Sequence, residues 1–133
     1  MDCLLDTHTL LWVLFEPAKL GKKTRGIIED PANRIFVSPI SYWEISLKHG
    51  LGKLILPNTD PSEIPGACLA QGFTESAADP AILSTFHRLS VNPDHRDPFD
   101  RLIIWQAIRN NQTLLSKDRS MAFYTAQGLK LPK

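Results

Sequence analysis

The chain has 133 residues, a length typical of one domain and sufficient to bury a hydrophobic core. Apolar residues make up 43% of it, but the longest apolar run, residues 10–15, is far shorter than the ~20 residues that a membrane span needs. The formal net charge of +1 gives no general affinity for polyanions, so any such contact must come from a local patch. The N-terminus does not resemble a signal peptide, so we expect a cytoplasmic protein in which Cys3 and Cys68 stay reduced.

In chain order, apolar runs and turn residues predict short strands that alternate with helices. Residues 3–5 form the first strand, and Asp6 or Thr7 caps a helix that ends before Pro17. The later elements are expected to be a helix over 22–29, a strand over 34–38, a helix over 39–51, a weaker helix over 60–71 interrupted by Pro65, a helix over 80–89, a helix from Asp97-Pro98 to 109, a strand over 113–116 and a short strand over 129–131.

The predicted strands are apolar throughout instead of alternating with polar residues. This pattern, with helices between the strands, is typical of the α/β class, in which helices cover both faces of a parallel sheet. In such sheets the ligand site lies at the carboxyl ends of the strands. We therefore expect functional side chains at that edge.

Two aspartates follow apolar strands directly. Asp6 comes after residues 3–5, and Asp118 follows the strand over 113–116. Both would project from the carboxyl edge of the sheet. Either could serve only as a helix cap or a turn residue, so their placement alone does not define a site.

Glu44 occupies an apolar position of its predicted helix. It follows Ile40 by four residues and precedes Leu47 by three, which places it within the apolar stripe. An inward carboxylate is costly unless it is paired or binds a cation. The alternative is a carboxylate at the edge of the stripe that reaches solvent or pairs with Lys48, four residues later.

Asp100 extends the apolar stripe of its helix in the same way, because Ile103 and Ile104 follow at helical spacing. An acid in the first turn also suits the helix dipole, which is the simpler reading. Asp97 lies three residues earlier, but its role as N-cap already accounts for it. We treat Asp97 as an accessory residue.

If the fold gathers these acids, several carboxylates share one pocket. Carboxylates that lie close together raise one another's pKa or attract a cation. Oxygen ligands without His or Cys favour Mg²⁺ or Mn²⁺. A hard cation held there can activate water and neutralise the negative charge on a reacting phosphate, which is the chemistry of phosphodiester hydrolysis.

Four ordered blocks of the sequence resemble the PIN-domain family, specifically its VapC-like toxin ribonucleases of type II toxin–antitoxin systems. The resemblance covers essentially the whole chain, residues 1–133, as one domain. The blocks are Leu4-Leu5-Asp6-Thr7-His8, Ser41-Tyr42-Trp43-Glu44-Ile45, Arg96-Asp97-Pro98-Phe99-Asp100-Arg101-Leu102 and Leu115-Ser116-Lys117-Asp118.

The resemblance implies a three-layer α/β/α sandwich around a short parallel sheet. It also implies a catalytic and metal-binding quartet that holds Mg²⁺ or Mn²⁺ and cleaves RNA, with Ser116 as a supporting hydroxyl. Such toxins are typically homodimers inhibited by a cognate antitoxin protein, and no membrane is involved. The quartet is Asp6, Glu44, Asp100 and Asp118, although Asp97 leaves the third ligand ambiguous by one helical turn.

Several other residues are weighed less heavily. Basic residues near the acids are candidates for phosphate contacts or ordinary surface charges: Lys48, Arg96, Arg101, Lys117 and Arg119. The four histidines show no metal-ligand spacing, and we interpret most of them as surface or loop residues: His8, His49, His87 and His95.

Trp12, Trp43 and Trp105 are expected in the core or an interface. The run 12–15 is apolar enough to suggest a subunit interface or an antitoxin groove.

Three alternatives remain open. A phosphatase with a covalent aspartyl intermediate needs a second Asp two residues after the first, where this chain has His8. A receiver-type signalling domain would use Lys117 but would not explain inward acids at Glu44 and Asp100. A catalytically silent PIN-like module would bind RNA or protein only, and the intact quartet argues against it.

Overall fold

The computed structural model describes residues 1–133 and contains one parallel sheet of four strands. The strands are β1 (Asp2–Leu5), β2 (Arg34–Val37), β3 (Thr74–Glu75) and β4 (Thr113–Leu115), in the spatial order β3-β2-β1-β4. β1 pairs with β2 on one side and with β4 on the other, with Leu5 opposite Val37 and Leu115. The first strand in the chain is therefore an inner strand of the sheet, with a neighbour on each side.

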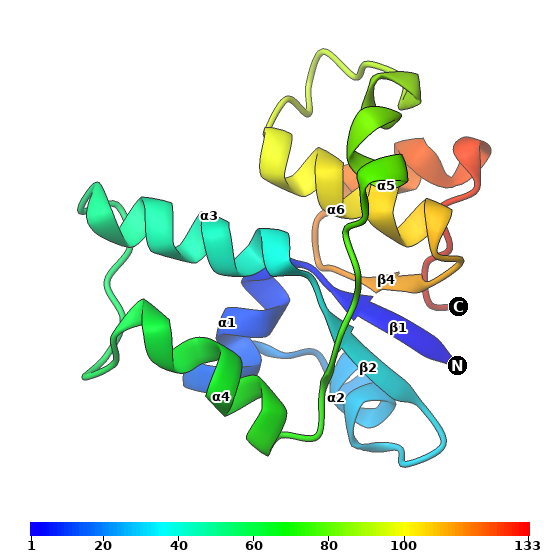
Figure 1. The fold of residues 1–133 in the computed structure, drawn as a ribbon. Helices are drawn as coiled ribbons and strands as arrows, with labels where there is room; N and C mark the ends of the chain where they lie inside the picture. The colour runs from blue at the N-terminus through cyan, green and yellow to red at the C-terminus, as the bar shows by residue number, and fades with distance from the viewer.

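Helices cover both faces of this sheet (Figure 1). Six α-helices are present: α1 (Thr7–Phe15), α2 (Lys22–Glu29), α3 (Pro39–Gly50), α4 (Ile64–Ala70), α5 (Pro80–Ser84) and α6 (Pro98–Arg109). Four 3-10 helices complete the fold: η1 (Pro17–Lys19), η2 (Pro61–Glu63), η3 (Phe86–Arg88) and η4 (Arg119–Gln127).

Alternate side chains of the inner strand β1 lie in two separate cores. Cys3 and Leu5 lie in one cluster with residues of α1, α3 and α4, whereas Leu4 lies in a second cluster with residues of α5, α6 and η4. Period-two alternation in a strand buried on both faces produces this division. The predicted three-layer α/β/α sandwich is confirmed.

Most predicted elements are present at or near their expected bounds. α2 and α6 begin and end as predicted, with Asp97 as the N-cap of α6. Cys3 and Cys68 are buried and unpaired. None of the helices has the length and the apolar character that crossing a membrane would require.

The structure corrects the helix expected over 80–89. α5 stops at Ser84, and η3 follows after Thr85. The indole of Trp105 donates to the carbonyl of Ile82 and to the hydroxyl of Thr85, and that hydroxyl in turn donates to the carbonyl of Ala81. These side-chain bonds occupy backbone acceptors that a continuing helix would use, so the chain turns there.

Three further differences concern short elements. Pro65 lies in the first turn of α4, where proline is tolerated, so it does not interrupt that helix. The strand expected over 129–131 is reduced to one bridge between Thr113 and Lys130. The two-residue strand β3 was not predicted because it is too short to show a periodicity. The nine-residue 3-10 helix η4, in which only Met121 and Tyr124 are buried, was not predicted either.

Candidate metal centre

Asp6 lies at the carboxyl end of β1, in the middle of the sheet edge. Its backbone N–H donates to the carbonyl of Leu115 over 3.2 Å, which joins the ends of β1 and β4. The side chain is the N-cap of α1, and its Oδ1 accepts the backbone N–H of Thr9 at 2.8 Å. Asp6 is 4% exposed, so its second carboxylate oxygen is held at this edge with little access to water.

Glu44 reaches the same region from α3, the helix that follows β2. The buried hydroxyls of Thr7 and Ser41 lie 2.9 Å apart and connect the first turn of α1 to α3. Glu44 is 2% exposed; its Oε2 accepts a hydrogen bond from Lys48, and its buried Oε1 has no partner. Glu44 therefore points inward and is not at the exposed edge of the stripe, although it does pair with Lys48.

The first turn of α6 contributes two carboxylates. Oδ1 of Asp97 accepts the backbone N–H groups of Phe99 at 2.8 Å and Asp100 at 3.4 Å. Its Oδ2 lies 3.9 Å from Nζ of Lys48. The Asp100 side chain is 16% exposed and turns towards the same space. Asp97 and Asp100 thus share one cluster instead of competing for one position.

Asp118 approaches from the other neighbour of β1, the strand β4. Its Oδ1 caps η4 by accepting the N–H of Ser120 at 2.9 Å, and its own N–H donates to Oγ of Ser116 at 3.0 Å. Asp118 is the most exposed acid of the group, at 40%. Asp6, Asp97 and Asp118 share one arrangement, because each caps a helix with Oδ1 and keeps Oδ2 available.

Electrostatics show that these acids form one cluster centred on Asp100. Burial, followed by negative charges around it, raises the pKa of Asp100 to about 7. The contributing charges, in order of size, are those of Asp97, Glu44, Asp6 and Asp118. A divalent cation would relieve this repulsion, so the cluster has the electrostatic character of a cation site.

The donor atoms fall into two sets that share Asp100. Ligand atoms of Glu44, Asp97 and Asp100 lie within 4.8 Å of one another, and so do those of His95, Asp100 and Asp118. Asp6 belongs to neither set but lines a cavity of about 290 Å³ together with Asp100 and Asp118. The remaining walls of that cavity are His8, Trp12 and Lys117. The unpartnered Oε1 of buried Glu44 fits a hard cation, since carboxylate oxygens are the ligands such ions prefer.

Three of the four histidines are exposed, which agrees with the prediction for most of them, and His95 is the buried exception. It lies in the loop before α6 but is only 7% exposed. Its Nε2 is 3.7 Å from Oδ2 of Asp100 and 3.5 Å from Oδ2 of Asp118. The sequence placed His95 five residues before Asp100 without any ligand spacing, so only its closeness to the acidic block hinted at this position.

The basic residues divide by what they contact. Burial lowers the pKa of Lys48, but the hydrogen bond and charge of Glu44, with the charges of Asp97 and Asp100, outweigh it and raise the pKa above its usual value. Arg101 donates to the carbonyls of Leu89 and Ser90 at 3.2 Å, so it braces a loop instead of lining the acidic cavity.

The exposed cations near the acids are fewer than the sequence suggested. Lys117 lines the cavity, lies 5.2 Å from the ring centre of Trp12 and donates to the carbonyl of Lys19. Arg96 is exposed and donates to the carbonyl of Pro93 at 2.8 Å, and Arg119 is exposed. Of the five basic residues that the sequence singled out, these three remain accessible to a polyanion.

The tryptophans differ in burial. Trp105 is a core residue, as expected, whereas Trp43 is 58% exposed and packs edge-on against Phe99 with ring centres 5.0 Å apart. Trp12 is half-buried and forms a wall of the acidic cavity. The neighbouring residues 13–15 pack against the core, which accounts for most of the apolar character of the run 12–15.

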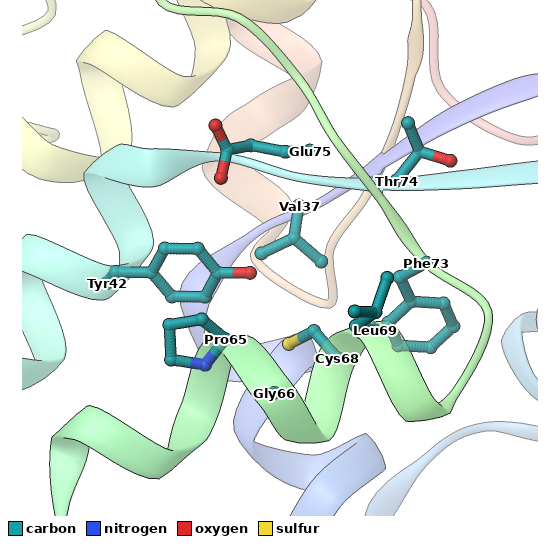
Figure 2. A pocket seen from close by; sticks show the side chains of 9 residues that line it. All are labelled: Val37, Tyr42, Pro65, Gly66, Cys68, Leu69, Phe73, Thr74 and Glu75. Atoms are coloured by element: carbon teal, nitrogen blue, oxygen red, sulfur yellow. The ribbon is translucent and has the colours of Figure 1, made fainter.

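A second cavity, of about 310 Å³, lies between α3, α4 and the strands β2 and β3 (Figure 2). Its floor is largely apolar, with Val37, Cys68 and Phe73, and Glu75 is the one carboxylate that lines it. Burial, and then a hydrogen bond with Cys68, raises the pKa of the Tyr42 phenol. With a single carboxylate, this cavity lacks the charge density of the acidic one.

The molecule is an α/β sandwich around a parallel sheet, with carboxylates gathered at one edge of that sheet. Its sequence identifies the family. Residues 3–126 match the PIN domain family, and the chain belongs to that family. The predicted family resemblance is confirmed.

The match to an individual curated protein covers less of the chain than the match to the family does. Ribonuclease VapC16 of Mycobacterium tuberculosis is 36% identical over 66 residues, which cover 50% of this chain and 45% of that protein. The match therefore spans less than half the length of this curated relative.

Two solved structures share the fold. VapBC2 from Rickettsia felis, solved bound to a DNA fragment from their promoter, superposes with a TM-score of 0.64 at 18% identity, covering 99% of this chain and 98% of that one. VapBC-1 from nontypeable Haemophilus influenzae superposes with a TM-score of 0.65 at 16% identity, covering 100% and 98% of the two chains.

Proposed function

We propose that this chain is a metal-dependent endoribonuclease and the toxin component of a toxin–antitoxin module, with one catalytic domain over residues 1–133. The observation that carries the proposal is the gathering of carboxylates around Asp100, where burial and then the neighbouring negative charges raise the pKa of Asp100 to about 7. Family membership and the partial match to a ribonuclease support the same reading. An RNA substrate and two free thiols fit a cytoplasmic location.

The proposed cation is Mg²⁺ or Mn²⁺, held by Asp6, Glu44, Asp100 and Asp118 with Asp97 as an accessory. A bound cation supplies Lewis acidity, which lowers the pKa of a water ligand and neutralises charge on a phosphate. The chain positions the ligands by capping: Asp6, Asp97 and Asp118 are each fixed by backbone N–H groups. Ser116 holds the turn before Asp118 through the Asp118 N–H.

Lys48 has a separate part in this proposal. In the metal-free protein it neutralises some of the charge of Glu44 and lies near Asp97. Its side chain is about one-third exposed, so the ammonium has space to withdraw towards solvent when a cation enters. Lys48 thus offsets part of the negative charge of the cluster without closing it to a cation.

The proposed substrate is RNA, whose phosphates would approach between the acids and the accessible cations. Lys117 at the cavity wall, with Arg96 and Arg119 nearby, would contact flanking phosphates and position the strand. With a net charge of only +1, such local contacts must provide the electrostatic attraction. Binding is therefore expected to be strongly salt-dependent.

The decisive experiment measures cleavage of a fluorophore–quencher RNA by purified protein with Mg²⁺, with Mn²⁺ and with EDTA. We expect metal-dependent cleavage that Asp100→Asn abolishes. Asp79→Asn is the matched control, because Asp79 caps α5 through Oδ1 but lies outside the acidic cluster. Full activity of Asp100→Asn would contradict the proposal. RNA binding without cleavage by the wild-type protein would instead support the silent binding module.

The proposed partners are a cognate antitoxin and a second copy of this chain. The Rickettsia felis and Haemophilus influenzae structures are VapBC complexes, which supports an antitoxin partner here. For the homodimer, α3 and its C-cap residue Leu51 offer an exposed apolar stripe, in which Trp43 and Leu47 precede Leu51 at helical spacing. We expect light scattering to show a dimer of the purified chain and Leu47→Asp to shift it to the monomer. A wild-type monomer would contradict this assignment.

A further inference from the structure

His95 is a buried imidazole with one ring nitrogen left without a partner. The side chain is 7% exposed, and no protein atom forms a hydrogen bond with Nε2. Buried polar atoms in proteins are almost always satisfied, so an exception needs an explanation. This nitrogen faces Oδ2 of Asp100 at 3.7 Å and Oδ2 of Asp118 at 3.5 Å, both longer than a normal hydrogen bond.

The other ring nitrogen is well fixed. Nδ1 lies 2.8 Å from the hydroxyl of Tyr124, which is fully buried, and the two rings pack edge to face with centres 5.5 Å apart. The backbone N–H of His95 also donates to the carbonyl of Asn92 at 3.0 Å. Tyr124 belongs to η4, the same helix that Asp118 caps. The contact with Tyr124 therefore fixes the imidazole so that Nε2 faces the carboxylate of Asp118.

We propose that His95 is a metal ligand through Nε2, which together with Asp100 and Asp118 forms a mixed nitrogen–oxygen cation position. This inference rests on the proposed function and deepens it. The set of Glu44, Asp97 and Asp100 offers only oxygen, whereas the set with His95 adds imidazole. Because imidazole suits first-row transition metals more than Mg²⁺, this position prefers Mn²⁺.

The contact with Tyr124 supports ligation. Metal-bound imidazoles commonly use the second ring N–H to donate to a neighbouring oxygen, which fixes the tautomer and the ring orientation. A proton on Nδ1 donated to the Tyr124 hydroxyl leaves the lone pair of Nε2 directed at the two carboxylates. The alternative places a proton on Nε2, so that His95 acts as a partner of the carboxylates and competes with a metal. The two arrangements predict opposite effects of removing the ring.

The test compares metal binding by the metal-free wild-type protein, by His95→Asn and by Tyr124→Phe. An asparagine side chain reaches the position of Nδ1 but has no atom at that of Nε2. By calorimetric titration we expect His95→Asn to weaken Mn²⁺ binding about 10- to 100-fold and to change Mg²⁺ binding by less than about threefold. Tyr124→Phe should weaken Mn²⁺ binding by a smaller factor. Unchanged or tighter Mn²⁺ binding by His95→Asn overturns the inference.

A measurement on the wild-type protein avoids any dependence on the folding of a variant. Electron spin-echo modulation of bound Mn²⁺ should contain the ¹⁴N signal of a coordinated imidazole. Bound Mn²⁺ without that signal overturns the ligand role of His95 while leaving the proposed function intact. Failure of the wild-type protein to bind either ion overturns both, which separates the two claims.

Discussion

The hydroxyls of Thr7 and Ser41 form a buried hydrogen bond, 2.9 Å long, that couples the helix after β1 to the helix after β2. Thr7 follows Asp6 directly, and Ser41 precedes Glu44 by one turn of α3. The bond therefore sets the distance between two of the carboxylates. Both hydroxyls are uncharged, so removing this hydrogen bond tests the positioning of Asp6 and Glu44 separately from the electrostatics of the cluster.

Thr7→Val keeps the shape of the side chain but leaves the Ser41 hydroxyl buried without a partner. We expect the free energy of unfolding to fall by about 1–3 kcal/mol in urea denaturation, and metal affinity to fall with it. Thr59→Val is the control, because the Thr59 hydroxyl donates to a carbonyl in an exposed loop. A Thr7→Val protein as stable as the wild type would show that the bond contributes nothing.

Asp6 combines a capping role with a negative charge, and two variants separate them. Asp6→Asn retains an Oδ1 that can cap α1, so its stability should be close to that of the wild type. Asp6→Ala should lose about 1 kcal/mol because the cap is gone. Both should lose RNA cleavage by about 10²-fold or more, as the charge is absent from each. Substantial activity in Asp6→Asn would assign Asp6 to capping alone.

The raised pKa of Asp100 makes the stability of the metal-free protein depend on pH. Its pKa is about 7 in the folded protein and 3.8 in the reference state, so the folded state binds more protons between these values. Stability from this group is therefore greatest below about pH 4 and is lost as the pH rises to about 7. After allowance for solvent screening, the loss is about 1–2 kcal/mol.

The comparison that isolates this effect is Asp100→Asn against the wild type in EDTA. The difference in unfolding free energy, variant minus wild type, should grow in favour of the variant as the pH rises from 4 to 7. Urea denaturation at several pH values measures it. A difference independent of pH would refute the assigned pKa shift.

Metal binding should relieve the repulsion between the carboxylates of the cluster and stabilise the fold. At an Mg²⁺ or Mn²⁺ concentration 100 times the Kd, linkage predicts about 2.7 kcal/mol of added stability, visible as a higher Tm. Addition of EDTA should remove the increase. Asp100→Asn should show a smaller increase, whereas Asp79→Asn should respond like the wild type. Equal increases in Asp100→Asn and the wild type would place the metal elsewhere.

Lys117 tests the proposed RNA contact. Lys117→Ala should weaken RNA binding and reduce the slope of log K against log salt by about 0.7, the value for one phosphate of a single strand. Lys23→Ala is the control, since Lys23 is exposed on α2 and lines no part of the acidic cavity. Binding should be measured by fluorescence anisotropy in EDTA, where no cleavage occurs. An unchanged salt slope in Lys117→Ala would remove this residue from the interface.

The sequence alone determined the class of fold and indicated most of the acids that the fold brings together. Apolar strands between amphipathic helices indicate a parallel sheet covered on both faces, because local periodicity reflects which faces are buried. An acid inside an apolar stripe, as at Glu44 and Asp100, is costly unless it is paired or binds a cation, so it marks a candidate site. Both signals depend only on spacing along one element.

Only the tertiary structure decided which elements become neighbours. The order β3-β2-β1-β4 places Asp6 between the strand that leads to Glu44 and the strand that leads to Asp118. Long-range packing also buries His95 against Tyr124 and turns Arg101 towards a loop. Such contacts join residues far apart in the chain, and their energies depend on shape and burial, which no periodicity of a single segment records.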